Sequence, residues 1–271
     1  MELNNIILTC GTSLLYNLRQ LETHESTQFR YSLVELYRNL NISNQDMSPG
    51  VDYGSDPFVQ QWVEEILACY RHHSRDLVDL CSTLQDGSSG PFGVELSALA
   101  MLKKRQEGRL WANRRDRIVL LVPNSMGGLL SGMVLQAALV EFCQTPAKLI
   151  EMIPITGMHE NPVDMAAVLK ALATAVTNQL CPQTHKTAWS NILLAASAYR
   201  YCLPCLTAIS VMYGVELIYA VDSSNRLHSL HSDWEAGAGQ AGTTEKMEKS
   251  EPPDYLAIIT KSRHQSASHK F

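Results

Sequence analysis

Short apolar segments alternate with helical patterns along most of this chain, and that alternation constrains its fold more than any other feature. Strands are expected at residues 5–10, 117–122, 147–153, 191–195 and 215–221 and, with a weaker pattern, at 255–260. Helices are expected at residues 57–84, 93–104, 129–142 and 163–179. Several of these strands are apolar on both faces, as strands buried between two helical layers are. The alternation predicts an α/β domain with a mainly parallel central sheet flanked by helices.

Length and charge limit the classes of function. The chain has 271 residues, of which 45% are hydrophobic, so it can build one large domain with a sizeable core. We expect that domain at residues 1–230, followed at 231–271 by a flexible linker, a possible edge strand and a polar tail. A net charge of −5 argues against a binder of long DNA or RNA. It leaves room for a small anionic ligand held by a few local donors.

Two further features bear on the cellular compartment. The seven cysteines are an odd number and most lie in apolar runs, which indicates free thiols in a reducing cytoplasm. The chain opens without a basic leader, so we expect a cytoplasmic protein. Residues 120–142 are long and apolar enough to imitate a membrane span, but their middle reads PNSMGG. That composition is typical of a turn, so we predict a strand, a turn and a helix there, with no membrane partner.

The first segment that could carry chemistry is TCGTSLL at residues 9–15, where a strand runs into a turn. Gly11 permits a tight turn and the close approach of a ligand. Thr12 or Ser13 can cap the next helix, and the free N–H groups of a helix start suit a phosphate. The spacing taken alone favours a plain strand-to-helix turn with a serine cap.

The second segment repeats this layout at residues 122–132. Asn124, Ser125, Met126, Gly127 and Gly128 follow a strand and precede a helix, and they could present donors to a second phosphate. The spacing of the glycines matches neither a P-loop nor a dinucleotide-binding GxGxxG.

The third segment follows the strand at 191–195 and contains Ser197, Ala198, Tyr199 and Arg200. An arginine can form two bonds to a phosphate, and a tyrosine can stack on a base. A surface arginine flanked by half-buried tyrosines is the alternative. Ligands of open α/β sheets bind beyond the carboxyl ends of the strands, so we predict that the three turns converge.

With these turns in place, the sequence resembles the CARF domains, the Rossmann-like sensors of type III CRISPR systems. IILTCGTSLL at residues 6–15 resembles the opening strand and turn of that family, and VELSAL at 94–99 is similar to a stretch of its next helix, with Glu95 at the family's glutamate. RIVLLVPNSMGGLLSGMVLQ at 117–136 resembles the second strand and helix. YCLPCLTAISVMYGVELIYAVDSS at 201–224 is similar to the segment after the family's Asn-x-Thr-Gly-Gly-Phe-Lys motif.

The resemblance runs in order from about Asn4 to Leu230 and implies a function. It implies a homodimer that binds a cyclic oligoadenylate, most often cyclic tetra-adenylate, across its interface. Stand-alone members include ring nucleases, which cut this antiviral messenger into linear diadenylates with 2′,3′-cyclic phosphates, without metal or cofactor. We therefore expect a ring nuclease with Ser13 and Arg200 as catalytic residues that stabilise charge on the phosphate.

Departures from the family keep other functions open. Residues 194–200 read LAASAYR, so Ser197 and Ala198 replace the motif's glycines and Arg200 replaces its lysine. A non-cleaving binder or sensor that regulates a partner is the main alternative. A ribonuclease of the HEPN class needs an arginine followed, after four to six residues, by a histidine on the same helix. Residues 226–231 and 263–269 offer that spacing, but both segments are polar and have no helical apolar face. The histidines show no metal-ligand spacing, and no GxGxxG follows the first strand to suggest a nicotinamide enzyme.

Overall fold

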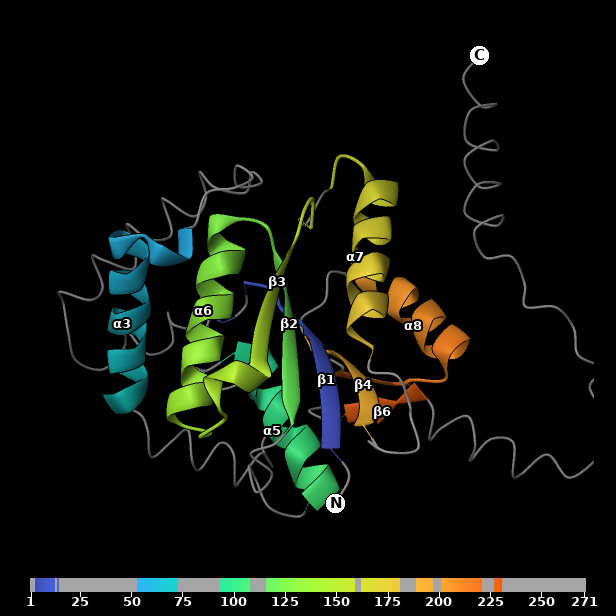
Figure 1. The fold of residues 1–271 in the computed structure, drawn as a ribbon, viewed down its shortest axis with the longest axis horizontal. Coiled ribbons are helices and arrows are strands. Elements are labelled where there is room, and N and C mark those ends of the chain that lie inside the picture. The colour runs from blue at the N-terminus through green and yellow to red at the C-terminus, as the bar shows by residue number, and fades with distance from the viewer. Residues whose placement is uncertain are drawn as a thin grey trace, which may run out of the picture. The chain divides into compact units, whose positions relative to one another are not determined.

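The computed structural model describes residues 3–12, 14, 53–72, 93–107, 116–158, 162–180, 189–196, 201–220 and 227–230. They form a six-stranded sheet of order β3-β2-β1-β4-β5-β6 with helices on both faces (Figure 1). β1 to β5 are parallel, and β6 alone runs antiparallel to its neighbour. The predicted α/β fold with a mainly parallel sheet is confirmed, and its topology is Rossmann-like.

The strands are β1 Leu3–Thr9, β2 Arg117–Pro123, β3 Ile150–Ile155, β4 Trp189–Ala195, β5 Glu216–Ala220 and β6 Leu227–Ser229. The helices are α3 Pro57–His72, α5 Gly93–Glu107, α6 Met126–Glu141, α7 Met165–Gln179 and α8 Cys202–Tyr213. Short 3₁₀ helices occupy Tyr53–Ser55 and Ala147–Leu149.

The direction of the strand order reverses between β1 and β4. The chain passes from β1 outward through β2 to β3, and then returns to β4 on the other side of β1 before it reaches β5. Such a reversal opens a crevice at the carboxyl ends of the two strands where the order changes. The topology therefore places the ends of β1 and β4 at the position where ligands of this fold class bind.

Two apolar cores lie on the two faces of the sheet. Ile6 and Leu8 of β1 point to one core, with α3, α5 and α6, while Ile7 points to the other, with α7 and α8. Alternate residues of a strand face opposite ways, so β1 needs apolar side chains at successive positions. Figure 1 shows α7 and α8 together on one side of the sheet and α6 with α3 on the other.

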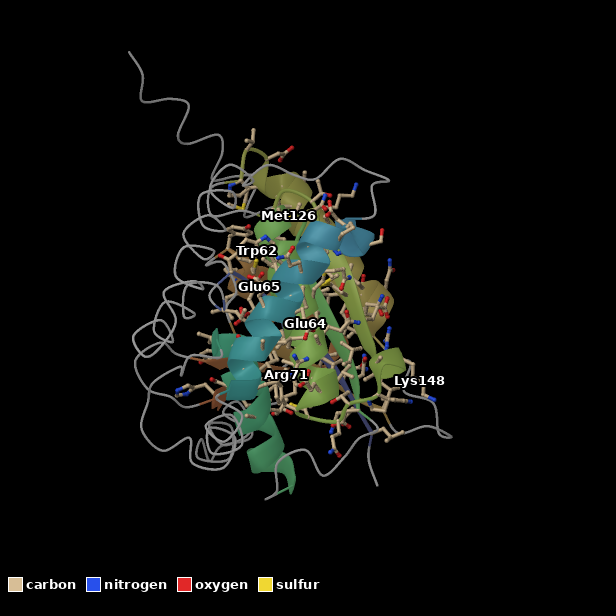
Figure 2. The ribbon with its side chains drawn as sticks, turned by 90° about the vertical axis from the view of Figure 1, so that its left-hand side faces the viewer. Trp62, Glu64, Glu65, Arg71, Met126 and Lys148 are labelled. Atoms are coloured by element: carbon tan, nitrogen blue, oxygen red, sulfur yellow. The ribbon has the colours of Figure 1, made fainter. Side chains whose placement is uncertain are left out.

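Helix α3 adds a further layer over α6. Ile66 and Tyr70 of α3 are fully buried, and Figure 2 shows α3 lying over α6 with Arg71 near its end. The Arg71 guanidinium bonds to both carboxylate oxygens of Glu141 on α6, at 2.6 and 2.9 Å, and to Glu64 of its own helix at 2.6 Å. Because α6 is covered by the sheet on one side and α3 on the other, apolar residues surround it instead of forming a stripe.

Two glycines let α6 lie unusually close to β2. A Cβ at Gly128 would stand 2.2 Å from the carbonyl oxygen of Pro123, and one at Gly132 would stand 2.5 Å from the Met152 sulfur. No other residue fits at Gly128 without a shift of the backbone. The close approach fixes the start of α6 directly above the carboxyl end of β2.

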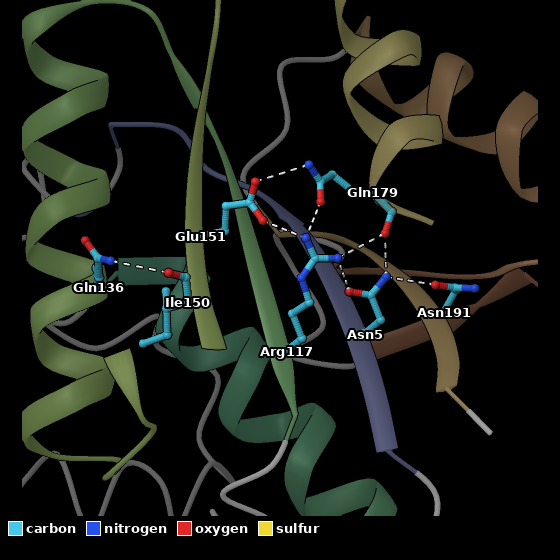
Figure 3. A network of polar contacts seen from close by, with 7 residues as sticks. All are labelled: Asn5, Arg117, Gln136, Ile150, Glu151, Gln179 and Asn191. Atoms are coloured by element: carbon cyan, nitrogen blue, oxygen red, sulfur yellow. Dashed lines mark hydrogen bonds and ion pairs between the residues drawn. The ribbon is translucent and has the colours of Figure 1, made fainter. Parts of the chain in front are cut away.

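A polar network closes the opposite, amino edge of the sheet (Figure 3). The Arg117 guanidinium bonds to Asn5 Oδ1 at 3.3 Å, to Glu151 Oε2 at 2.6 Å, and to the side chain and carbonyl of Gln179. Asn5 Nδ2 also donates to the Gln179 carbonyl and to Asn191, both at 2.8 Å. Arg117 and Asn5 thereby satisfy the carbonyl at the last residue of α7, where the helix dipole favours a cation.

The two edge strands of the described sheet are irregular. β3 contains Pro154, which pairs with Val122 of β2, and the exposed Glu151. β6 has three residues, and its Ser229 hydroxyl donates to Glu216 at 2.8 Å.

Several predicted boundaries change. Residues 147–149, expected to begin a strand, form a 3₁₀ turn after Pro146, so β3 starts at Ile150. α6 begins three residues earlier than expected, because Ser125 caps it. β6 lies in a polar stretch near the end of the expected domain, where no strand was predicted. The predicted strand, turn and helix at residues 120–142 are confirmed, and no helix in the described ranges is long and apolar enough to cross a membrane. Residues 73–84 and 255–260 lie outside the described residues.

Candidate functional site

Three strands end side by side at the carboxyl edge of the sheet. Thr9, the last residue of β1, lies opposite Leu121 of β2 and Ala195 of β4. The next residue, Cys10, still donates its backbone N–H to the Leu121 carbonyl at 2.8 Å. The segments that follow β1, β2 and β4 therefore begin at one edge of the sheet.

The turn after β1 is hydrogen-bonded to a buried acidic residue. The Gly11 N–H donates to Glu95 Oε1 at 3.0 Å, and Glu95 is 2% exposed in the first turn of α5. A carboxylate is stabilised at that place because the first N–H groups of a helix face it. α5 begins at Gly93 with φ +86°, where a Cβ would stand 3.1 Å from the Leu14 Cα. The start of α5 and the first turn are thus packed directly against each other.

The second turn is built by a helix cap. Ser125 Oγ accepts from the Gly128 N–H at 3.2 Å, and the Ser125 side chain is buried. Asn124 donates its backbone N–H to the Ile155 carbonyl at 3.0 Å, and its Nδ2 to Thr156 Oγ1 at 3.4 Å. These bonds tie the turn after β2 to the turn after β3. Ser125 therefore acts as the N-cap of α6, and this cap fixes the first turn of the helix at the carboxyl edge of the sheet.

The predicted site residues fall into two groups. The structure places seven of them at the ends of the neighbouring strands β1 and β2: Gly11, Thr12, Asn124, Ser125, Met126, Gly127 and Gly128. The others, Ser13, Ser197, Ala198, Tyr199 and Arg200, lie outside the described residues. Residues 197–200 join Ala196, at the end of β4, to Tyr201, just before α8, so that segment leaves from the same edge.

Two polar residues at this edge were not predicted as site residues from the residue patterns. Thr9 is 1% exposed, and its Oγ1 has no hydrogen-bond partner within the described part of the chain. Its signal is a hydroxyl directly after the apolar run of Ile6, Ile7 and Leu8. Glu95 stood out in the sequence only through the family resemblance, although an acid in the apolar run VELSALAML is itself a signal. A buried hydroxyl such as that of Thr9, with no partner in the described part of the chain, favours a functional site.

The Cys10 thiol at this edge is poorly suited to act as a nucleophile. Burial, and next the negative charge of Glu95, raise the pKa of Cys10 well above its ordinary value, so its thiol stays protonated and a poor nucleophile. Among the described residues, no three histidine, cysteine or carboxylate side chains gather in the way a metal ion requires. What the edge offers is a helix start at α6 and two short turns, an arrangement suited to an anion.

A scan of protein-family models finds no match to this chain, and a search of curated proteins finds no relative.

Proposed function

We propose that this protein is a metal-independent ring nuclease that binds cyclic tetra-adenylate and cleaves it to linear diadenylates with 2′,3′-cyclic phosphates. Its role would be to switch off type III CRISPR signalling. The observation that carries the proposal is the position of two short turns at the carboxyl ends of the neighbouring strands β1 and β2, beside the point where the strand order reverses. The resemblance of residues 4–230 to CARF domains identifies the class of ligand.

The geometry of the described edge supports an anionic ligand. The Ser125 cap and the close packing of Gly128 hold the start of α6 at the end of β2, and that helix carries no acidic residue in its first turn. Backbone N–H groups at a helix start favour phosphate without any nearby lysine. A ligand with several phosphates can engage the turns together, which a single anion cannot.

The proposed reaction needs no cofactor. A ribose 2′-oxygen forms a bond to the adjacent phosphorus while the bond from phosphorus to the 5′-oxygen breaks. The 2′-hydroxyl loses its proton to water, and the departing 5′-oxygen gains one. Binding that bends the ring for in-line attack lowers the barrier by orientation. Arg200 and Ser13 stabilise the charge on the phosphate oxygens, and Arg200 acts electrostatically because a guanidinium does not give up its proton.

The test uses the purified full-length chain and radiolabelled cyclic tetra-adenylate in the presence of EDTA. The proposal expects linear diadenylates ending in a 2′,3′-cyclic phosphate, resolved from the ring by chromatography. Cyclic hexa-adenylate, tested in parallel, reports ring size. Absence of cleavage contradicts the proposal, whether or not the ring binds.

A non-cleaving sensor is the second candidate, and one observation favours it. Ser197 and Ala198 stand where the CARF motif has glycines, and Arg200 stands in place of its lysine. Under this alternative the protein binds the ring with measurable affinity, and the recovered ligand remains cyclic after prolonged incubation.

A further inference from the structure

We propose that Glu95 is a positioning residue for the carboxyl-edge site, holding the first turn in its binding shape through the Gly11 N–H. This inference rests on the proposed function, because the site it serves is the ring-binding site. Glu95 lies 84 residues after Gly11 and on another element, so the bond is a tertiary contact and not part of a local turn.

Glu95 lies on the buried side of the turn after β1 and contacts it directly. Its Oε1 accepts from Gly11 at 3.0 Å, and a Cβ built on Gly93 would lie 3.1 Å from its Oε2. Glu95 is 2% exposed, so its carboxylate is shielded from solvent. A buried carboxylate keeps its place only where hydrogen bonds and a favourable dipole offset the loss of water.

The direction of the Gly11 N–H has a consequence for the ligand. Since this donor already serves Glu95, Gly11 contributes the shape of the turn and not a bond to phosphate. The ligand must then use donors further along the turn, beginning with Thr12, which is half-buried. Without Glu95, the Gly11 N–H is released, and Thr12 loses the fixed direction that binding requires.

The experiment compares Glu95→Gln, Glu95→Asp and Glu95→Ala in the full-length chain. Gln keeps an oxygen that can accept from Gly11 and removes the charge. Asp keeps the charge but withdraws it by about 1.5 Å, the length of one carbon–carbon bond. Ala removes the acceptor. Glu65 of α3, labelled in Figure 2, accepts from Gln61 of the same helix at 2.9 Å and supplies the matched controls Glu65→Gln and Glu65→Ala.

The first readout is amide hydrogen exchange at Gly11, measured by NMR without any ligand. We expect exchange at Gly11 to accelerate on the order of 10–100-fold in Glu95→Ala and Glu95→Asp, and to change little in Glu95→Gln. Ile7 and Val119, which are buried in β1 and β2, report whether the fold itself survives. If Glu95→Ala fails to fold, the contrast between Glu95→Asp and Glu95→Gln decides the question.

The second readout is the affinity for cyclic tetra-adenylate. The proposal expects binding to weaken at least 10-fold in the variants that release Gly11, and Glu95→Gln to rescue it, with both Glu65 variants unchanged. Unchanged exchange at Gly11 overturns the proposal, and so does unchanged affinity once Gly11 is released. Failure of the proposed function looks different, because wild type would then bind no ring while the exchange at Gly11 still responded to Glu95.

Discussion

Individual residues at the carboxyl edge divide into those that build it and those that would touch a ligand. Glu95 and Ser125 are both buried acceptors, and each holds one backbone N–H of a glycine. Neither has to meet the ligand for its loss to matter, because each fixes the position of a turn. The residues proposed to act on the phosphate are Ser13 and Arg200.

The first prediction concerns Arg200 and Ser13. Arg200→Ala should lower the rate of ring cleavage by about 100–1000-fold, the usual loss when one donor to a developing charge is removed. Ser13→Ala should weaken cleavage strongly. Rates are measured under single-turnover conditions, so that they report the chemical step. Arg71→Ala, which removes an arginine on the outer layer of α3, is the control. Cleavage by Arg200→Ala at the wild-type rate would refute the assignment.

The sequence could identify some site residues but not the contacts between them. Gly11 and Ser125 follow apolar strands in turn-like segments, which is a local signal. The bond from Gly11 to Glu95 joins residues 84 positions apart, and nothing in the local pattern announces it. Thr9 escaped for the same reason, since the burial of its hydroxyl depends on β2 and β4 as neighbours.

At the scale of elements, the placement of α6 connects packing to the site. Its first turn includes Gly128, whose N–H completes the Ser125 cap and whose missing side chain lets the helix touch Pro123. Gly132 lies one turn further on and faces Met152 and Val122. Both glycines lie in the contact between α6 and the sheet. A side chain at Gly128 would collide with backbone, whereas one at Gly132 would collide only with side chains.

The second prediction compares Gly128→Ala with Gly132→Ala. At Gly128 the added methyl meets the carbonyl oxygen of Pro123, so we expect a loss of about 1–3 kcal/mol in the free energy of unfolding. Gly132→Ala should cost less, because the flexible Met152 side chain can move and Ala favours a helix over Gly. Urea denaturation measures both. We also expect ring binding to weaken in Gly128→Ala and not in Gly132→Ala. Equal losses of unfolding free energy in the two variants would contradict this account.

The third prediction concerns the two ion pairs of Arg71, one with Glu64 within α3 and one with Glu141 of α6. Hydrogen bonding from Arg71 lowers the pKa of exposed Glu64. A carboxyl whose pKa is lowered by folding stabilises the fold above its unfolded pKa of about 4.3, and this stabilisation is lost as pH falls through the lowered value. Arg71→Ala should therefore lower the melting temperature slightly at pH 7, and the deficit should shrink towards pH 3 and in high salt.

Ile66→Ala in the same helix is the apolar control for Arg71. Ile66 is fully buried, so its truncation should cost about 2–5 kcal/mol with little dependence on salt. An Arg71→Ala deficit that stays constant from pH 7 to pH 3 would show that the ion pairs do not contribute in this way.

The sequence predicts the elements well where periodicity is strong and poorly where a cap or an edge decides. The strands β1, β2 and β4 stand out in the sequence because they are buried on both faces. Their apolar residues therefore follow one another directly, without the polar residues that the period of an amphipathic helix would place among them. The start of α6 was placed too late because Gly127 and Gly128 look like turn residues until the Ser125 cap is seen. β6 has three residues and depends on pairing with β5, which no local pattern reveals.

At the scale of the whole molecule, the proposed function requires a second copy. A tetra-adenylate ring has four-fold chemical repetition, while the described carboxyl edge of one chain offers two turns, with a third segment leaving beside them. A two-fold homodimer would present each donor twice, as isologous assembly always does. Net charge and length limit the class of ligand, but they do not show that a second copy of the chain takes part.

The fourth prediction is the stoichiometry of binding. Isothermal titration calorimetry should give one cyclic tetra-adenylate per two chains, and light scattering should give a mass twice 30.1 kDa when the ring is bound. Arg71→Ala should leave the stoichiometry unchanged. One ring bound per monomeric chain would exclude a site shared across a two-fold axis.

The irregular edge strands restrict how two copies can meet. Pro154 has no N–H to offer a further strand beside β3, and Glu151 adds a charge there. On the far side of the described sheet, β6 is too short to template a long ladder. Continuation of the sheet from one molecule into the next is therefore disfavoured at both of these margins. This protects a chain rich in apolar strands against fibre-like growth. Under the proposed function, the two copies would then associate through helices and loops.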